Sequence, residues 1–156
     1  MIAPSRDAAF LNRVVNHPAV HPWVSLGIKG DLDLTSSVAD PRNIFLANEY
    51  GGFLLIAKEA FVYELHTQFL PEGRGKLAYE AGRDGCAYMF TRTDCLRIDT
   101  YIQRGHKATE RYARSVGFRQ WGETELHGHP CYYYVLTIKE WAKRLDLCQQ
   151  QQSLQS

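Results

Sequence analysis

The alternation of apolar and polar side chains is clearest over residues 60–70, where it predicts a β-strand. One face of this strand carries Tyr63, Leu65, Thr67 and Phe69, and the other carries Val62, Glu64, His66 and Gln68. A central strand of an α/β sheet normally has apolar residues on both faces. The row of three polar side chains therefore predicts that one face of this strand opens on a cleft.

A helical period replaces the alternation after residue 75. Apolar or small residues recur four apart, at Leu77, Ala81, Gly85 and Met89, which predicts a helix over about residues 75–90. The turn at residues 71–76 joins the strand to this helix and contains two glycines. Free backbone N–H groups at a helix N-terminus suit a phosphate or pyrophosphate, and Arg74 and Lys76 add positive charge there.

The rest of the pattern predicts one α/β (α+β) domain with a mixed, mostly antiparallel sheet flanked by helices. We expect a first helix that is capped by Asp7 and stops before His17, and a later helix that ends at Gly117. Further strands are expected at residues 43–48, 53–57, 96–102, 118–126 and 131–138. A last helix should start at Thr137 and bury Ile138, Trp141, Ala142 and Leu145. We expect the domain to span residues 1–145 and a polar tail to follow over residues 146–156. Residues 17–42 are rich in turn formers, and they are either substrate contacts or plain connection.

Composition narrows the classes of function. The 156 residues are 45% hydrophobic and 22% charged, which is typical of a soluble globular protein. No apolar run approaches the roughly 18 residues of a membrane span, and the first residues lack the apolar core of a signal peptide. The four cysteines have no paired spacing, so we expect reduced thiols in a cytoplasmic protein, without disulfide framework or metal site.

Charge is nearly balanced overall but uneven along the chain. The net charge is +1, whereas residues 71–119 alone carry a net +4. A nucleic-acid-binding protein would be far more basic, so we expect neither nucleic acid nor a membrane as partner. The basic middle of the chain fits an anionic ligand, although a solvated helix surface explains the same charge.

The order of elements and the turn after residue 70 resemble the GNAT (Gcn5-related) N-acetyltransferase superfamily. In that family the fourth strand runs into a turn of the type Pro-Glu-Tyr-Arg-Gly-Lys-Gly-x-Gly, whose backbone amides hold the pyrophosphate of acetyl-CoA. Pro71, Glu72, Arg74, Gly75 and Lys76 match this turn, whereas Gly73 takes the place of the tyrosine, and Leu77 and Tyr79 take the places of the two later glycines. The resemblance implies acetyl-CoA as cosubstrate, bound by Arg74, Gly75, Lys76 and the backbone of Gln68, Phe69 and Leu70.

A second family signature, Asn-x-x-Ala-x-x-x-Tyr-x-x-x-Gly-Phe, ends at Gly117 in this chain. His106 then stands at the asparagine position, which implies that it contacts the cosubstrate, and Ala113 stands where the family has its tyrosine. That tyrosine often protonates the leaving thiolate. Tyr112 lies one residue away, a rotation of about 100° around a helix. Tyr112 is therefore a candidate proton donor, with a place in the core as its alternative.

Glu64 and His66 are the candidate bases for acetyl transfer to an amine. They share one face of the strand, and either could remove a proton from the acceptor's ammonium group, directly or through a water. Burial would raise the pKa of the Glu64 carboxyl toward a useful value, and a histidine needs no large shift to act near neutral pH. Structural alternatives are an exposed or arginine-paired Glu64 and a hydrogen-bonded His66.

Two functions follow from the resemblance. The first is an acetyl-CoA-dependent N-acetyltransferase that acts on a primary amine of a small molecule or protein. The second comes from a narrower likeness to small GNAT-like proteins of tailed phages, seen in Tyr63–His66, Phe90–Thr93 and Ala113–Phe118. This second function is that of a catalytically degenerate protein, which has either a binding role or a structural role among phage virion proteins. A homodimer is a further open alternative.

Overall fold

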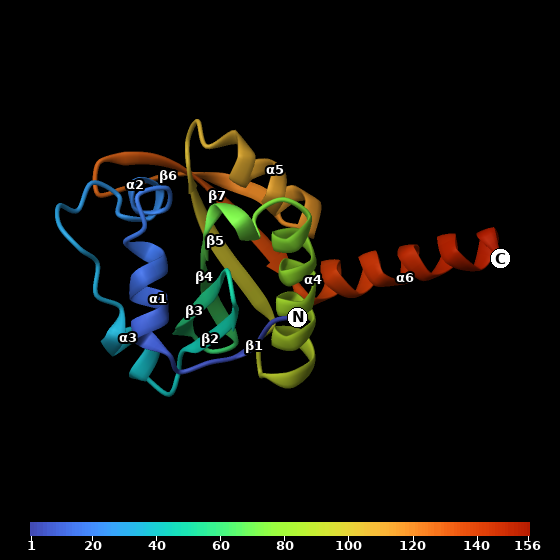
Figure 1. Ribbon diagram of the computed structural model, residues 1–156. Helices are drawn as coiled ribbons and strands as arrows, with labels where there is room; N and C mark the ends of the chain where they lie inside the picture. Colours follow the sequence, from blue (N-terminus) through green and yellow to red (C-terminus); the bar gives the residue numbers. More distant parts are fainter.

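Seven strands form one sheet in the order β1-β2-β3-β4-β5-β7-β6 in the computed structural model, which describes residues 1–156 (Figure 1). The strands are β1 (Ala3–Pro4), β2 (Ile44–Asn48), β3 (Gly51–Glu59), β4 (Val62–Phe69), β5 (Arg97–Gln103), β6 (Arg119–Leu126) and β7 (His129–Thr137). All neighbours pair antiparallel except β4 and β5, which are parallel. The predicted mixed, mostly antiparallel sheet is therefore confirmed.

Helices cover both faces of this sheet, with α1 and α3 on one side and α4 and α5 on the other (Figure 1). The helices are α1 (Ala8–Val15), α2 (His21–Val24), α3 (Thr35–Ala39), α4 (Lys76–Arg92), α5 (Lys107–Val116) and α6 (Ile138–Gln155), and a short 3₁₀ turn, η1, spans Pro71–Gly73. Asp7 caps α1 by accepting the Phe10 N–H, and Thr137 caps α6 by accepting the Glu140 N–H, as their sequences predict.

Three short elements were not predicted from the sequence. β1 has two residues and belongs to the sheet only because it pairs with Leu46 and Ala47 of β2. The helices α2 and α3 lie inside residues 17–42, which the sequence analysis treats as irregular. Segments of two to five residues have no detectable period, so a sequence pattern cannot reveal them.

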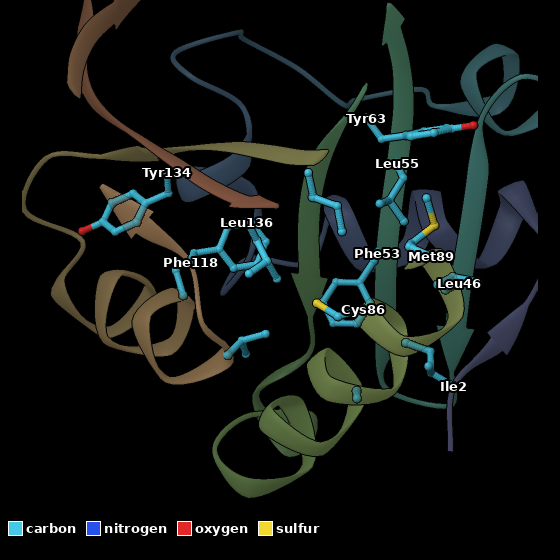
Figure 2. Packing of buried hydrophobic residues seen from close by; sticks show 14 of the residues in the cluster. Ile2, Leu46, Phe53, Leu55, Tyr63, Cys86, Met89, Phe118, Tyr134 and Leu136 are labelled. Atoms are coloured by element: carbon cyan, nitrogen blue, oxygen red, sulfur yellow. The ribbon is translucent and has the colours of Figure 1, made fainter. Parts of the chain in front are cut away.

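The two faces of the sheet have separate apolar cores. The larger core lies under α4 and α5 and includes buried Leu46, Phe53 and Tyr134 (Figure 2). The smaller one lies under α1 and α3 and includes Leu11 and Phe45. Tyr63, Leu65 and Phe69 of β4 all face the larger core, so the predicted alternation along β4 is confirmed.

The strands β4 and β5 pair over only three residues, from Val62–Arg97 to Glu64–Asp99. Thr100 Oγ1 then donates a hydrogen bond to the Leu65 carbonyl oxygen (3.0 Å), one residue beyond the last pair on each strand. Both strands continue beyond this point, to Phe69 and Gln103. The sheet therefore opens between its two parallel strands.

The last helix differs from its prediction. Ile138 and Trp141 pack against the larger core, but Ala142 is exposed, Leu145 is 38% exposed, and no residue of α6 is buried. The helix also runs on to Gln155 and projects away from the sheet (Figure 1), so the segment expected as a polar tail is helical. The apolar stripe of α6 is longer than the surface available to cover it.

Candidate functional site

A cleft of about 740 Å³ lies where β4 and β5 diverge. This volume is within the range of small-molecule sites. Its walls come from the end of β4, the turn at Arg74–Lys76, the first turns of α4 and α5, and the segment of residues 19–24 around α2. The two helices both direct their N-termini at the cleft, which favours a negatively charged ligand.

The free edge of β4 forms one wall of the cleft. Leu65 directs its carbonyl oxygen toward β5, so by alternation the backbone groups of Thr67 and Phe69 face the same way. Leu70 instead donates its N–H to Tyr50 at 2.8 Å, on the side of the β3–β4 hairpin, and Gln68 shares that direction. The prediction of Gln68 and Leu70 as backbone contacts is therefore corrected to Thr67 and Phe69, because strand edges alternate in direction.

The turn after β4 depends on Gly75. This residue has φ +68° and ψ −128°, which L-residues with a Cβ rarely adopt, and it is the N-cap of α4. Lys76 follows as the first residue of the helix, lines the cleft and forms an exposed pair with Glu80 (3.7 Å). The sequence-predicted pair of Gly75 and Lys76 thus lies on the cleft wall.

Arg74 also lines the cleft, but its guanidinium is engaged by the protein. Its Nη2 donates to the Ala19 carbonyl oxygen at 2.8 Å, and its Nε donates to the Phe69 carbonyl oxygen at 3.3 Å. Arg74 therefore connects the free edge of β4 to the segment around α2, a contact across 55 residues that the sequence does not show.

His106 is the N-cap of α5 and lies across the cleft from the turn. Its ring stacks on Trp23 of α2, with centroids 3.9 Å apart and planes 14° apart. Thr109 Oγ1 contacts the same imidazole at 3.0 Å from Nδ1. Burial lowers the pKa of His106, and the nearby positive charge of Arg74 lowers it further. Both effects favour the neutral form of this imidazole in the cleft wall.

Tyr112 lies at the back of the cleft and braces α5 against α4. Its hydroxyl donates a hydrogen bond to the Ala78 carbonyl oxygen at 2.9 Å, and burial raises its pKa well above the ordinary value. Gly82 makes this contact feasible, because a Cβ there would meet the Tyr112 hydroxyl. This geometry corresponds to the core alternative of the sequence analysis.

Glu64 and His66 form a pair on the face of β4 that points away from the larger core. His66 Nε2 lies 3.0 Å from a Glu64 carboxylate oxygen, and Lys58 Nζ lies 2.9 Å from the other oxygen. His66 and then Lys58 lower the pKa of Glu64 to about 2, against the opposing effect of burial. The expected rise of this pKa is therefore wrong, because two neighbours from β3 and β4 stabilise the carboxylate.

The polar row does not line the cleft. Thr67 and Phe69 face it, whereas Glu64 and His66 lie on the opposite face of the sheet and Gln68 is buried, with its Oε1 unpaired. The prediction that the polar row of Glu64, His66 and Gln68 opens on the cleft is therefore wrong. Glu64 nevertheless stands in register with Asp99 of β5, at the last pair before the strands diverge.

Several residues that line the cleft were not predicted as contacts, and three of them carry polar or aromatic groups of interest. Thr67, Trp23 and Arg111 line the cleft, and none was predicted as a contact by itself. Thr67 had a signal, since it is the polar member of an otherwise apolar strand face. Trp23 lies within residues 17–42, which were named only as a segment, and Arg111 has no local pattern that separates it from a solvated helix surface.

Two further features concern other classes of function. No three His, Cys, Asp or Glu side chains come together in a group that could hold a metal ion. None of the helices combines the length and hydropathy that a bilayer crossing requires.

Neither a protein-family model nor a curated protein matches the sequence. Solved structures do match the fold. A GNAT-family acetyltransferase from Bacillus anthracis has a TM-score of 0.68 at 18% identity, over 87% of this chain and 94% of its own. Spermidine N-acetyltransferase from Vibrio cholerae, in complex with CoA and spermine, has a TM-score of 0.74 at 13% identity, over 91% and 97% of the two chains. The aminoglycoside acetyltransferase AAC(6')-Ib, in complex with coenzyme A and kanamycin, has a TM-score of 0.71 at 15% identity, over 92% and 97%.

These likenesses show that the chain has the GNAT acetyltransferase fold. At identities below 20%, the likeness extends to the path of the chain and leaves the chemistry of each side chain to be argued from this structure.

Proposed function

We propose that this protein transfers an acetyl group from acetyl-CoA to a primary amine of a small molecule. The observation that carries the proposal is the cleft at the end of β4, beyond its last pair with β5, which combines a free strand edge, two helix N-termini and three cationic side chains. The neighbours in complex with CoA, spermine or kanamycin support the same choice of cosubstrate and acceptor class.

The cosubstrate would lie along β4. Backbone groups of Thr67 and Phe69 would pair with the amides of its pantetheine arm as a further strand would. Its diphosphate would meet the N-terminus of α4, where Gly75 allows close approach of the backbone and Arg74 and Lys76 supply charge. Arg111 adds a third cation to the same cleft.

The acceptor would approach from the other face of the sheet. The strands cease to pair beyond Glu64–Asp99, and an amine beside Glu64 and His66 would have to reach the thioester past this point. We propose His66 as the base that removes the ammonium proton, because its imidazole is partly exposed and paired with Glu64. Glu64, with its pKa lowered to about 2, would orient that imidazole as a carboxylate.

Tyr112 is not assigned the role of proton donor in this proposal. Its hydroxyl proton is directed at Ala78, and a change of partner would leave the hydroxyl without its hydrogen bond in a buried place. His106 is assigned to the cosubstrate side of the cleft, together with Trp23.

Calorimetric titration with acetyl-CoA and with CoA tests the proposal. We expect both to bind in the micromolar range or somewhat weaker, corresponding to about −8 to −6 kcal/mol. A matched control is Arg104→Gln, which removes a cation outside the cleft that pairs with Glu123 and should leave the affinity unchanged. Failure of both ligands to bind at millimolar concentration would overturn the proposal.

A second candidate is a binding or virion protein that keeps the fold without catalysis. It is supported by the engaged hydroxyl of Tyr112 and by Leu77 and Tyr79 at the two glycine places of the turn. Co-purification with phage particles, together with absent CoA binding, would favour it. Two other predictions also stay open. One is a protein amino group as the acceptor, and the other is a homodimer.

A further inference from the structure

Residues 17–24 cross one side of the cleft and are called the strap here. Ala19, Val20 and Trp23 of the strap line the cleft opposite α4 and α5. Its helix α2 has four residues, none of them buried, and no side-chain cap. Val24 packs against the smaller core and fixes the far end of the strap. Val20 is the one buried residue of the strap, at 4% exposed, so packing holds the strap at Val20 and Val24, and the residues between them are not buried.

Two contacts hold the strap to the other walls. One is the Arg74 hydrogen bond to the Ala19 carbonyl oxygen at 2.8 Å. The other is the stack of Trp23 on His106 at 3.9 Å. The first contact comes from the turn before α4 and the second comes from the start of α5. The strap is therefore held from both helices of the cleft.

Arg74 has competing uses. Its guanidinium donates hydrogen bonds to two neutral carbonyl groups, those of Ala19 and Phe69. The Phe69 carbonyl lies on the free edge of β4, where a ligand amide would have to pair. A phosphate brings a full negative charge to its hydrogen bonds with the guanidinium, which a neutral carbonyl lacks, and the guanidinium fork fits two phosphate oxygens. A diphosphate at the adjacent N-terminus of α4 would therefore compete for Arg74.

We infer that Arg74 is a positioning residue that couples occupation of the diphosphate end of the cleft to release of the strap. A diphosphate withdraws the guanidinium from Ala19 and Phe69 in one movement. This frees the strand edge for the rest of the ligand and leaves the strap held by the Trp23 stack and by the packing of Val20 and Val24. The identity of the ligand as coenzyme A rests on the proposed function, whereas the contact between Arg74 and the strap does not.

The ligand-free arm of the test uses amide hydrogen exchange of residues 17–24. Arg74→Gln should speed exchange there on the order of tenfold, the factor expected for loss of one hydrogen bond from a charged group. Lys76→Gln is the matched control, because Lys76 lines the same cleft but contacts Glu80 and not the strap. Arg74→Lys, which keeps the charge but lacks the guanidinium fork, should give a smaller increase. Equal exchange in Arg74→Gln, Arg74→Lys and the parent would overturn the inference.

The ligand arm adds coenzyme A or inorganic diphosphate, with binding followed by calorimetry. In the parent, saturation with either should raise exchange of residues 17–24 several-fold, and in Arg74→Gln it should add nothing further. Bound ligand with unchanged or slower exchange in the strap overturns the coupling while the proposed function stands. No binding of coenzyme A overturns the proposed function, and the coupling is then decided by inorganic diphosphate, whose failure to bind or to raise exchange overturns it.

Discussion

The Tyr112 hydroxyl donates a hydrogen bond to the carbonyl oxygen of Ala78, 34 residues earlier in the chain. This contact ties the second helix of the cleft to the first. Since it engages the proton that a catalytic tyrosine would deliver, Tyr112→Phe should retain most of the acetyl-transfer activity. It should lower the free energy of unfolding by about 1 kcal/mol, the usual net value of such a bond. Urea unfolding and turnover of the same preparation check both parts.

The opposite outcome would restore Tyr112 as proton donor. A loss of turnover of a hundredfold or more with normal CoA binding is of the size expected for removal of a general acid. Gly82→Ala is a useful companion, because its Cβ would meet the Tyr112 hydroxyl. It should destabilise the protein by about 1–3 kcal/mol through overpacking without altering the chemistry directly.

Gly75→Ala tests the turn. The φ of +68° and ψ of −128° lie outside the conformations that alanine adopts without strain, although the Cβ itself would meet no atom. We expect a cost of about 1–2 kcal/mol in stability and weaker binding of CoA, since the strain is relieved by moving the backbone. Gly105→Ala is the matched control, with a positive φ and open space but no place on the cleft. Equal CoA affinity in both variants would contradict this account.

Glu64 should make stability depend on pH in the acid range. Its pKa is lowered from 4.5 to about 2 in the folded protein, mainly by His66 and also by Lys58. The unfolded chain therefore binds the proton first, and the stability that Glu64 contributes is present above about pH 4.5 and lost as the pH falls toward 2. Urea unfolding from pH 6 to pH 2 should show a shallower decline in Glu64→Gln than in the parent.

The comparison needs an exposed carboxylate as reference. Glu123 pairs with Arg104 at 2.7 Å, but both side chains are about half exposed, so the pair should contribute little. Glu123→Gln is expected to follow the parent curve. If Glu64→Gln follows it too, the ion pair with His66 and Lys58 does not persist in solution.

His66 and Glu64 should differ in their effect on turnover. If His66 is the base, His66→Ala lowers kcat by about a hundredfold or more and leaves CoA binding intact, because the residue does not line the cleft. Glu64→Gln keeps the hydrogen bond to the imidazole but removes the charge, so it should lower kcat less than His66→Ala does. Unchanged turnover in both variants would remove the pair from the mechanism.

Removal of residues 146–156 tests the domain boundary. These residues are exposed and the helix that contains them projects away from the sheet. A chain that ends at Leu145 should unfold within about 2 °C of the full-length protein, since surface changes away from packed groups usually cost under 0.5 kcal/mol. A large fall in Tm, or a change in elution volume on size exclusion, would instead assign α6 to a contact between copies.

The sequence alone determined the local architecture. The alternation along β4, the helical period of α4 and the turn with Arg74, Gly75 and Lys76 all have their causes within a few residues, and the structure has them as predicted. Only the tertiary structure decided which groups those residues contact. Which edge of β4 is free depends on where β5 diverges, and the partner of Tyr112 lies on another helix. The pKa of Glu64 is set in part by Lys58 across the β3–β4 hairpin. Local order follows from steric and periodic preferences of neighbouring residues, whereas partners and charge environments arise from contacts that sequence spacing does not encode.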